Sequence, residues 1–219
     1  MNHICVFDFE TDLAEAPACN PVEVACKMLD PFSLDWVPNS DFCSGIRPHT
    51  IDDADYLTKE RLETIKWHCN LKGQTQSDIL KEWRNYPDEK VVWKQFINHV
   101  NIYNKKNSRY HAPIAAGMNI KNFDLKIVDK LNERYKQDEF FNYEIIDLRD
   151  LAYFWLRWDK SLRSRSLDSL RDYFGIKQED AHTAWADVDD SGSLISRFLK
   201  LHKSQSPKIK FKGSFEEKQ

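Results

Sequence analysis

The chain lacks three features that would assign a protein to a broad class. It contains no run of about eighteen apolar residues and no signal peptide before Phe7, so a membrane-spanning helix is not expected and a soluble, cytoplasmic protein is predicted. Its net charge is only −3, which gives no global electrostatic argument for binding nucleic acid. It also shows no internal repeat, and its 219 residues are typical of one domain.

Paired cysteines are also missing. The five cysteines are odd in number and include no C-x-x-C pair, which argues against a disulfide framework and against the common zinc motifs. An irregular zinc site is the alternative, and its candidate ligands are Cys19, Cys26, Cys43, His68 and Cys69. Free buried thiols in a reducing compartment are the favoured interpretation.

What the chain does have is a pair of carboxylates at the end of a hydrophobic strand. Asp8 and Glu10 follow the apolar run Ile4–Phe7, and side chains two apart on a strand point to the same side. Burying two like charges together is costly, and a divalent cation with a preference for oxygen ligands, Mg²⁺ or Mn²⁺, removes that cost. A solvated strand edge or a helix cap is the alternative.

A third carboxylate follows a later strand. The apolar stretch from Ile114 reaches Gly117 and a polar turn, and a helical pattern of apolar residues then begins near Phe123. Asp124 therefore lies in the first turn of a helix that leaves the end of a strand. Its simplest role there is a favourable charge at a helix amino terminus.

A histidine and a fourth carboxylate open the last helix. His182 and Asp187 are five residues apart, so they would point about 140° apart if both were helical. If Thr183 is the N-cap, His182 lies on the preceding loop and can approach the site of Asp187. A solvent-facing loop histidine is the alternative.

These motifs, in this order, resemble the DEDDh exonuclease family, which includes the proofreading epsilon subunit of bacterial DNA polymerase, oligoribonuclease and ribonuclease T. The segment 166–176 is similar to the "S-L-x-x-L-x-x-x-F-G-I" helix of that family, and Asp147 to the aspartate that follows its second motif. The resemblance covers roughly residues 3–202. It implies an α/β, ribonuclease-H-like fold in which helices flank a mixed five-stranded sheet.

The predicted chemistry is metal-dependent hydrolysis of a terminal phosphodiester. Four carboxylates in one pocket suit two Mg²⁺ (or Mn²⁺) ions about 4 Å apart; the predicted metal ligands are Asp8, Glu10, Asp124 and Asp187. His182 is the expected general base.

The resemblance adds the 3′-to-5′ direction of the reaction. We expect single-stranded DNA with a free 3′ end as substrate and nucleoside 5′-monophosphates as products. The alternatives are a 3′–5′ exoribonuclease that trims RNA or short oligonucleotides and, as a third hypothesis, a non-catalytic nucleic-acid-binding module.

A fainter similarity concerns the segment Leu62–Trp67 followed by Gln74. It resembles the "T-x-x-W…Q" segment of phage-type and actinobacterial stand-alone members, including the T-even phage exonuclease branch. One position departs from the family, because the usual glycine after the first motif is missing from the segment 10–13. How the backbone there approaches a terminal nucleotide is therefore open. The sequence gives no indication of a partner polymerase.

Substrate contacts are predicted less specifically. The candidates are Thr11, Asn119, Arg163, Arg165 and Trp185. The two arginines belong to a basic cluster that precedes the third motif and also includes Arg157, Lys160 and Arg171. This cluster could contact phosphates or be ordinary surface charge, and Trp185 could stack on a base or belong to the core.

The order of elements completes the prediction. We expect strands at 3–9, 22–28, 41–46, 112–117 and 143–147, and helices at 91–103, 122–135, 148–157, 166–174 and 184–202. The first three strands should form an antiparallel meander, and helical pieces in an insert of about 51–90 should pack on the sheet. The catalytic domain is thus predicted to span 1–202, followed by a mobile tail at 203–219.

Overall fold

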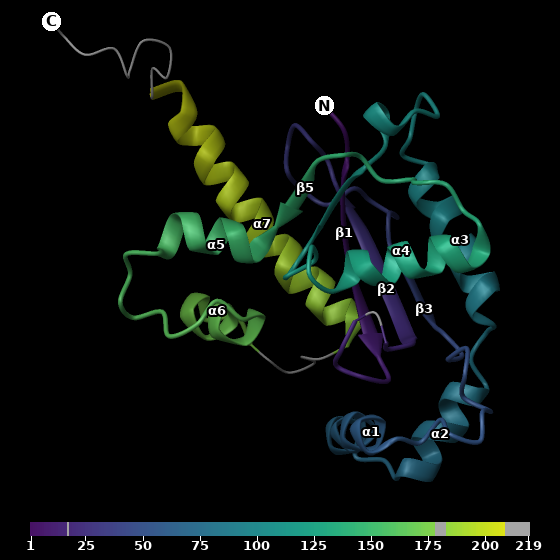
Figure 1. Ribbon diagram of the computed structural model, residues 1–219. Helices are drawn as coiled ribbons and strands as arrows, with labels where there is room; N and C mark the ends of the chain where they lie inside the picture. Colours follow the sequence, from purple (N-terminus) through teal and green to yellow (C-terminus); the bar gives the residue numbers. More distant parts are fainter. Residues whose placement is uncertain (17, 178–182, 209–219) are drawn as a thin grey trace, which may run out of the picture.

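A mixed five-stranded sheet with helices on both faces forms the body of the protein (Figure 1). The computed structural model describes residues 1–16, 18–177 and 183–208. The strands lie in the order β3-β2-β1-β4-β5. Their bounds are Ile4–Thr11 (β1), Pro21–Leu29 (β2), Phe42–Gly45 (β3), Ile114–Gly117 (β4) and Ile145–Asp147 (β5).

The two halves of the sheet differ in direction. Strands β1, β2 and β3 pair antiparallel, as the predicted meander requires, whereas β4 and β5 run parallel to β1. Parallel strands end at one edge of a sheet, so the residues at and after the carboxyl ends of β1, β4 and β5 are brought together there. This edge carries the predicted site.

The described chain also contains seven α-helices and two short 3₁₀ turns, joined by loops. The α-helices are Lys59–Lys72 (α1), Gln76–Arg84 (α2), Glu89–Asn101 (α3), Asp124–Tyr135 (α4), Leu148–Leu156 (α5), Leu167–Phe174 (α6) and Ala184–Gln205 (α7). The 3₁₀ turns are Arg109–His111 and Ser206–Lys208.

Alternation along β1 divides the core into two layers. Phe7 and Phe9 pack with the helices α3 and α4, in a cluster that includes Phe96 and Leu131. Side chains on the other face of β1, such as Val6, pack with α5, α6 and α7, which we call the α7 layer. Asp8 and Glu10 lie on the same face of β1 as Val6 and therefore point toward the α7 layer.

The helices α1 and α2 form a separate unit beyond the carboxyl end of β1, at the bottom of Figure 1. They have a small apolar cluster of their own, in which Ile65, Ile79 and Trp83 pack against Val22 and Tyr56. This unit corresponds to the predicted helical insert at 51–90.

The carboxyl-terminal helix is longer than the sequence pattern predicts. Helix α7 continues beyond residue 202 to Gln205, and the 3₁₀ turn follows directly. The remainder of the predicted mobile tail, 209–219, lies outside the described residues. Within the described part of the chain, none of the helices has the length and apolar character needed to span a membrane.

Candidate metal centre

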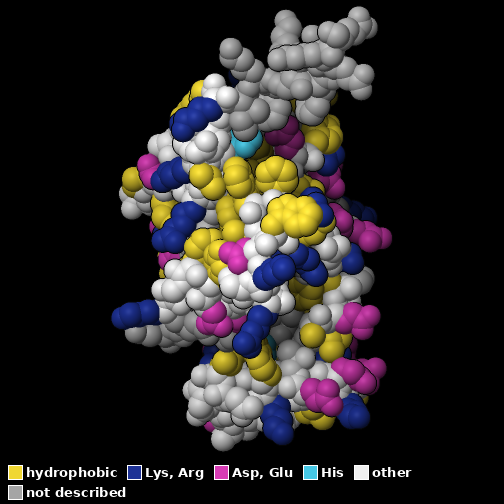
Figure 2. All heavy atoms as spheres, turned by 90° about the vertical axis from the view of Figure 1, so that its left-hand side faces the viewer, with side chains coloured by type: hydrophobic (Ala, Val, Ile, Leu, Met, Phe, Trp, Pro, Cys, Tyr) yellow, Lys and Arg dark blue, Asp and Glu magenta, His cyan; other side chains and the backbone are white. Residues whose placement is uncertain are grey.

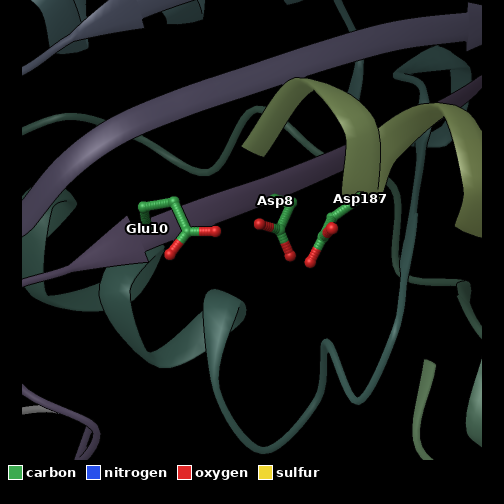
Figure 3. A group of neighbouring side chains, drawn as sticks. All are labelled: Asp8, Glu10 and Asp187. Carbon is green, nitrogen blue, oxygen red and sulfur yellow. The ribbon is translucent and has the colours of Figure 1, made fainter. Parts of the chain in front are cut away.

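Three carboxylates from two distant parts of the chain converge at the end of the sheet. Asp8 and Glu10 project from β1, and Asp187 projects toward them from the first turn of α7 (Figure 3). One carboxylate oxygen from each lies within 4.8 Å of the others. No other group of three or more potential metal ligands occurs among the residues that the structure describes.

Local folding explains this convergence. The strand alternation puts Asp8 and Glu10 on the face that α7 covers, and α7 packs across β1 and β2. Thr183 caps α7, since its side chain accepts a hydrogen bond from the N–H of Ala186, as the sequence predicts. The cap places Asp187 in the first turn, where the helix dipole favours a negative charge.

Asp124 joins the site from the opposite side of β1. It is the first residue of α4, and its Oδ1 accepts a hydrogen bond of 3.1 Å from the N–H of Phe9, between the two β1 acids. The side chain is buried and lines the same cleft as Asp8 and Glu10. It does not belong to the group of three whose oxygens lie within 4.8 Å.

The electrostatics of the cluster are those of crowded acids. Burial, reinforced by Asp124, Asp187 and Glu10, raises the pKa of Asp8 well above its usual range. Burial, followed by the charge of Asp187, raises the pKa of Glu10 to about 8. Burial likewise raises the pKa of Asp124 to about 7, against the opposing hydrogen bond from Phe9.

This donor set fits a divalent cation. A partly buried group of carboxylates repels itself, and a divalent cation that prefers oxygen ligands would neutralise it.

A buried arginine holds Asp187 from behind. Arg171, on α6, is fully buried; its Nη2 donates to Asp187 Oδ1 at 2.6 Å, its Nε to Asp190 Oδ2 at 2.7 Å and its Nη1 to Asp168 Oδ1 at 3.0 Å. Neither alternative considered for Arg171, a phosphate contact or ordinary surface charge, fits the structure, because its guanidinium is buried and engaged with carboxylates.

The carboxylates line a cleft of about 750 Å³. Helix α1 lines another part of this cleft, which we call the α1 wall, through Glu60, Glu63, Thr64, Trp67 and His68. The wall is fastened to β1 at the residue after Glu10, since His68 Nε2 donates to the carbonyl oxygen of Thr11 at 3.0 Å.

A second groove, of about 510 Å³, shares Met118 and Asn119 with the cleft. Four arginines line it: Arg149, Arg157, Arg163 and Arg165, and we call it the arginine groove. The aromatic side chains of Tyr153, Phe154 and Trp158 are exposed on the same segment. Figure 2, which views this side of the molecule, shows basic side chains interspersed with hydrophobic ones.

The predicted substrate residues fall in different places. Thr11 and Asn119 line the cleft, and Arg163 and Arg165 line the arginine groove. Trp185, on α7, is half-buried against the apolar cluster of the α7 layer, and the Lys27 ammonium lies 5.3 Å from its ring. Because Trp185 is not among the residues that line the cleft, the structure favours the alternative that it belongs to the core. His182 lies outside the described residues.

Sequence reasoning missed the α1 wall. A signal was present, because residues 60, 63, 64 and 67 recur at i, i+3, i+4 and i+7 and so share one face of a helix.

The cysteines form no metal site in the described chain. Cys5, Cys19 and Cys26 are buried free thiols as expected, whereas Cys43 is exposed and Cys69 half-buried.

No protein-family model and no curated protein matches the sequence. Solved structures do match. E. coli exonuclease I in complex with a dT13 oligonucleotide superimposes with a TM-score of 0.68 at 20% identity, over 95% of this chain and 42% of that one. The zinc-ion-bound E. coli exonuclease I–ssDNA complex gives a TM-score of 0.66 at 20% identity, with the same coverage.

Exonuclease I from Methylocaldum szegediense gives a TM-score of 0.66 at 19% identity, over 95% of this chain and 42% of that one. The chain has the ribonuclease-H-like fold of exonuclease I. The predicted fold class is thus confirmed. The chain spans less than half the length of these structures.

Proposed function

We propose that the protein is a metal-dependent 3′–5′ exonuclease that hydrolyses single-stranded DNA to nucleoside 5′-monophosphates. The observation that carries this proposal is the convergence of Asp8, Glu10 and Asp187 within 4.8 Å, with Asp124 on the same cleft. Carboxylates gathered in this way repel one another, and phosphodiester hydrolysis by bound divalent ions needs this donor set.

The solved structures support the proposal. Two of the matched structures, both of E. coli exonuclease I, are complexes with single-stranded DNA or a dT13 oligonucleotide, and one of these two holds zinc. Because identity is 20% or lower, this support concerns the fold, and activity is inferred from the cleft of this chain.

The proposal assigns three kinds of role: holding metal ions, orienting a metal ligand and accepting a proton. Asp8, Glu10, Asp124 and Asp187 would hold two Mg²⁺ or Mn²⁺ ions, which when bound activate water and stabilise the leaving oxygen. Arg171 orients Asp187 through the 2.6 Å hydrogen bond. His182, directly before the cap residue Thr183, takes a proton from the attacking water.

The arginine groove provides a path for the strand upstream of its 3′ end. The groove meets the cleft at Met118 and Asn119, so a strand with its end at the carboxylates can continue over Arg163 and Arg165. Local positive charge of this kind attracts phosphates even though the net charge of the chain is −3.

The test is degradation of end-labelled oligonucleotides by the purified protein. With a 5′ label, a ladder that shortens from the 3′ end should appear in Mg²⁺ or Mn²⁺ and vanish in excess chelator. The matched control is the double variant Asp8→Asn/Glu10→Gln, which keeps the shape of both side chains and should be inactive. Undiminished hydrolysis in chelator, or by this variant, would overturn the two-metal assignment.

The same assay chooses between the two nucleic acids. DNA and RNA of identical sequence, which differ at the 2′ position, should be compared at equal concentration. We expect faster turnover of DNA. Faster turnover of RNA would make the protein an exoribonuclease, and binding of either without hydrolysis would make it a non-catalytic binding module.

A further inference from the structure

The α1 wall of the cleft belongs to a helix that the proposed chemistry does not use. Glu60, Glu63, Thr64 and Trp67 lie on one face of α1 and line the cleft. This face is distinct from the one that joins the apolar cluster of the α1–α2 unit, whose α1 members are Ile65 and the half-buried Cys69. A ligand in the cleft would therefore meet these four side chains together with His68.

Trp67 is the aromatic side chain on this wall, and 40% of it is exposed. Its indole meets the ring of His68 edge-on, with centroids 5.0 Å apart and an interplanar angle of 75°. His68 in turn packs edge-on against the buried Trp83 at 5.3 Å. Since His68 also donates to the carbonyl oxygen of Thr11, Trp67 is held at a set position relative to β1.

The α1 wall of the cleft and the neighbouring arginine groove differ in charge. The α1 wall contributes the carboxylates of Glu60 and Glu63, which repel a phosphate backbone, and the arginine groove contributes four guanidinium groups, which attract one. A strand that enters through the groove therefore keeps its phosphates away from α1. The neutral part of the terminal nucleotide, its base, is left to face Trp67.

We propose that Trp67 stacks on the base of the 3′-terminal nucleotide and so positions the last phosphodiester over the carboxylates. This inference rests on the proposed exonuclease function and adds a binding site for an unpaired nucleobase. Stacking tolerates any base, because every base has a π-face. Stacking on Trp67 requires the terminal base to be unstacked from a duplex, so the site would select single-stranded and frayed ends.

The experiment compares two oligonucleotides that differ only in the terminal nucleotide, which carries thymine or is an abasic tetrahydrofuran analogue. Each is assayed with the wild-type protein, Trp67→Ala and Trp67→Phe. The control is Leu62→Ala, which removes an exposed apolar side chain of α1 that does not line the cleft. Circular dichroism melting of each variant checks that the fold persists.

With the thymine end, Trp67→Ala should lower kcat/KM about tenfold or more, while Trp67→Phe and Leu62→Ala retain most of it. Removal of the base should lower kcat/KM of the wild type by a similar factor and that of Trp67→Ala hardly at all. If the loss caused by Trp67→Ala and the loss caused by removal of the base multiplied when combined, the proposal would be overturned. A Trp67→Ala variant as active as Leu62→Ala would also overturn it.

A binding measurement keeps this inference separate from the proposed activity. Thymidine 5′-monophosphate, added with Mg²⁺, should quench a component of the tryptophan fluorescence that is absent in Trp67→Phe. Quenching of this component without hydrolysis of any oligonucleotide would retain the base site and refute the exonuclease. Equal quenching in wild type and Trp67→Phe would refute the base site whatever the activity.

Discussion

The guanidinium of Arg171 and the carboxylate of Asp187 are joined across 2.6 Å, although one lies on α6 and the other on α7. One oxygen of Asp187 thus belongs to a buried ion pair, and the residue also faces Asp8 and Glu10. The packing of α6 is in this way connected directly to the candidate metal centre. A change at Arg171 should therefore affect both stability and turnover.

Arg171→Met should lower the free energy of unfolding by about 3–5 kcal/mol, because it leaves Asp168, Asp187 and Asp190 without their shared cation. Arg171→Lys keeps the charge but loses the fork of donors, so it should retain more stability and still lower kcat at an unchanged KM. Urea unfolding and steady-state kinetics measure both. Arg134→Lys, which alters the remote ion pair with Glu89, is the control and should leave kcat unchanged. Wild-type kcat in Arg171→Lys would show that Asp187 needs no positioning.

Asp8 and Asp187 should differ in the metal-free protein although both are needed for turnover. Asp8→Asn removes an acid whose pKa is strongly raised by burial and neighbouring acids, so Tm in chelator should rise by about 2–4 °C. Asp187→Asn weakens the ion pair with Arg171 and should lower Tm instead. Calorimetry in chelator, with hydrolysis assayed in Mg²⁺, tests both. A fall in Tm for Asp8→Asn would indicate that this carboxylate stabilises the fold.

The stability of the metal-free protein should decrease as the pH rises. The pKa of Glu10 is raised from 4.5 to about 8 and that of Asp124 from 3.8 to about 7. The folded state therefore binds protons more tightly than the unfolded state, and this contribution is fully present below the unfolded values and is lost as the pH passes through 7 to 8. Urea midpoints measured in chelator between pH 5 and 8.5 should fall.

The matched control for this pH effect is Glu10→Gln/Asp124→Asn, in which the decline should be smaller because neither side chain titrates. Saturating Mg²⁺ should also reduce the decline in the wild type, since the cation takes over the neutralisation of the carboxylates. A wild-type midpoint that rises over the same range would contradict the raised pKa values.

The arginine groove should be visible in the salt dependence of binding. Arg163→Ala/Arg165→Ala should weaken binding of single-stranded DNA and reduce the slope of log K against log salt by about 0.7 for each phosphate that is no longer neutralised. Fluorescence anisotropy at several salt concentrations measures the slope. The control is Arg109→Ala, which removes a half-buried arginine that pairs with Glu139 and lines neither the cleft nor the arginine groove. An unchanged slope in the double variant would assign these arginines to ordinary surface charge.

Local patterns were sufficient to predict much of the fold. The alternation in β1 indicated the common face of Asp8 and Glu10, and the capping residue Thr183 indicated the start of α7. Both depend on a few consecutive residues. The helix at Asp124 was predicted by the same kind of local pattern, because its apolar residues recur with helical spacing.

Features that depend on tertiary partners could not be predicted in this way. Arg171 is indistinguishable in sequence from the neighbouring exposed arginines, and its burial arises because α7 brings Asp187 and Asp190 against it. The spacing of residues 60, 63, 64 and 67 indicates a common helix face, but only the tertiary packing of α1 shows that this face lines the cleft of the carboxylates. Trp185 was ambiguous for the same reason, since only the packing of α7 decides what it faces.

The final prediction concerns His182, whose proposed role is chemical and not structural. As a general base, it should contribute roughly 10²–10⁴ to kcat, so His182→Ala should lose that factor while Mg²⁺ affinity is retained. The wild-type rate should also fall as the pH drops through the usual imidazole pKa of about 6.5, and this limb should be missing in the variant. Titration calorimetry with Mg²⁺ and a pH–rate profile measure the two effects, and His202→Ala, near the other end of α7, is the control. A drop in Mg²⁺ affinity in His182→Ala as large as in Asp8→Ala would make the histidine a metal ligand, and the general base would then have to be sought elsewhere.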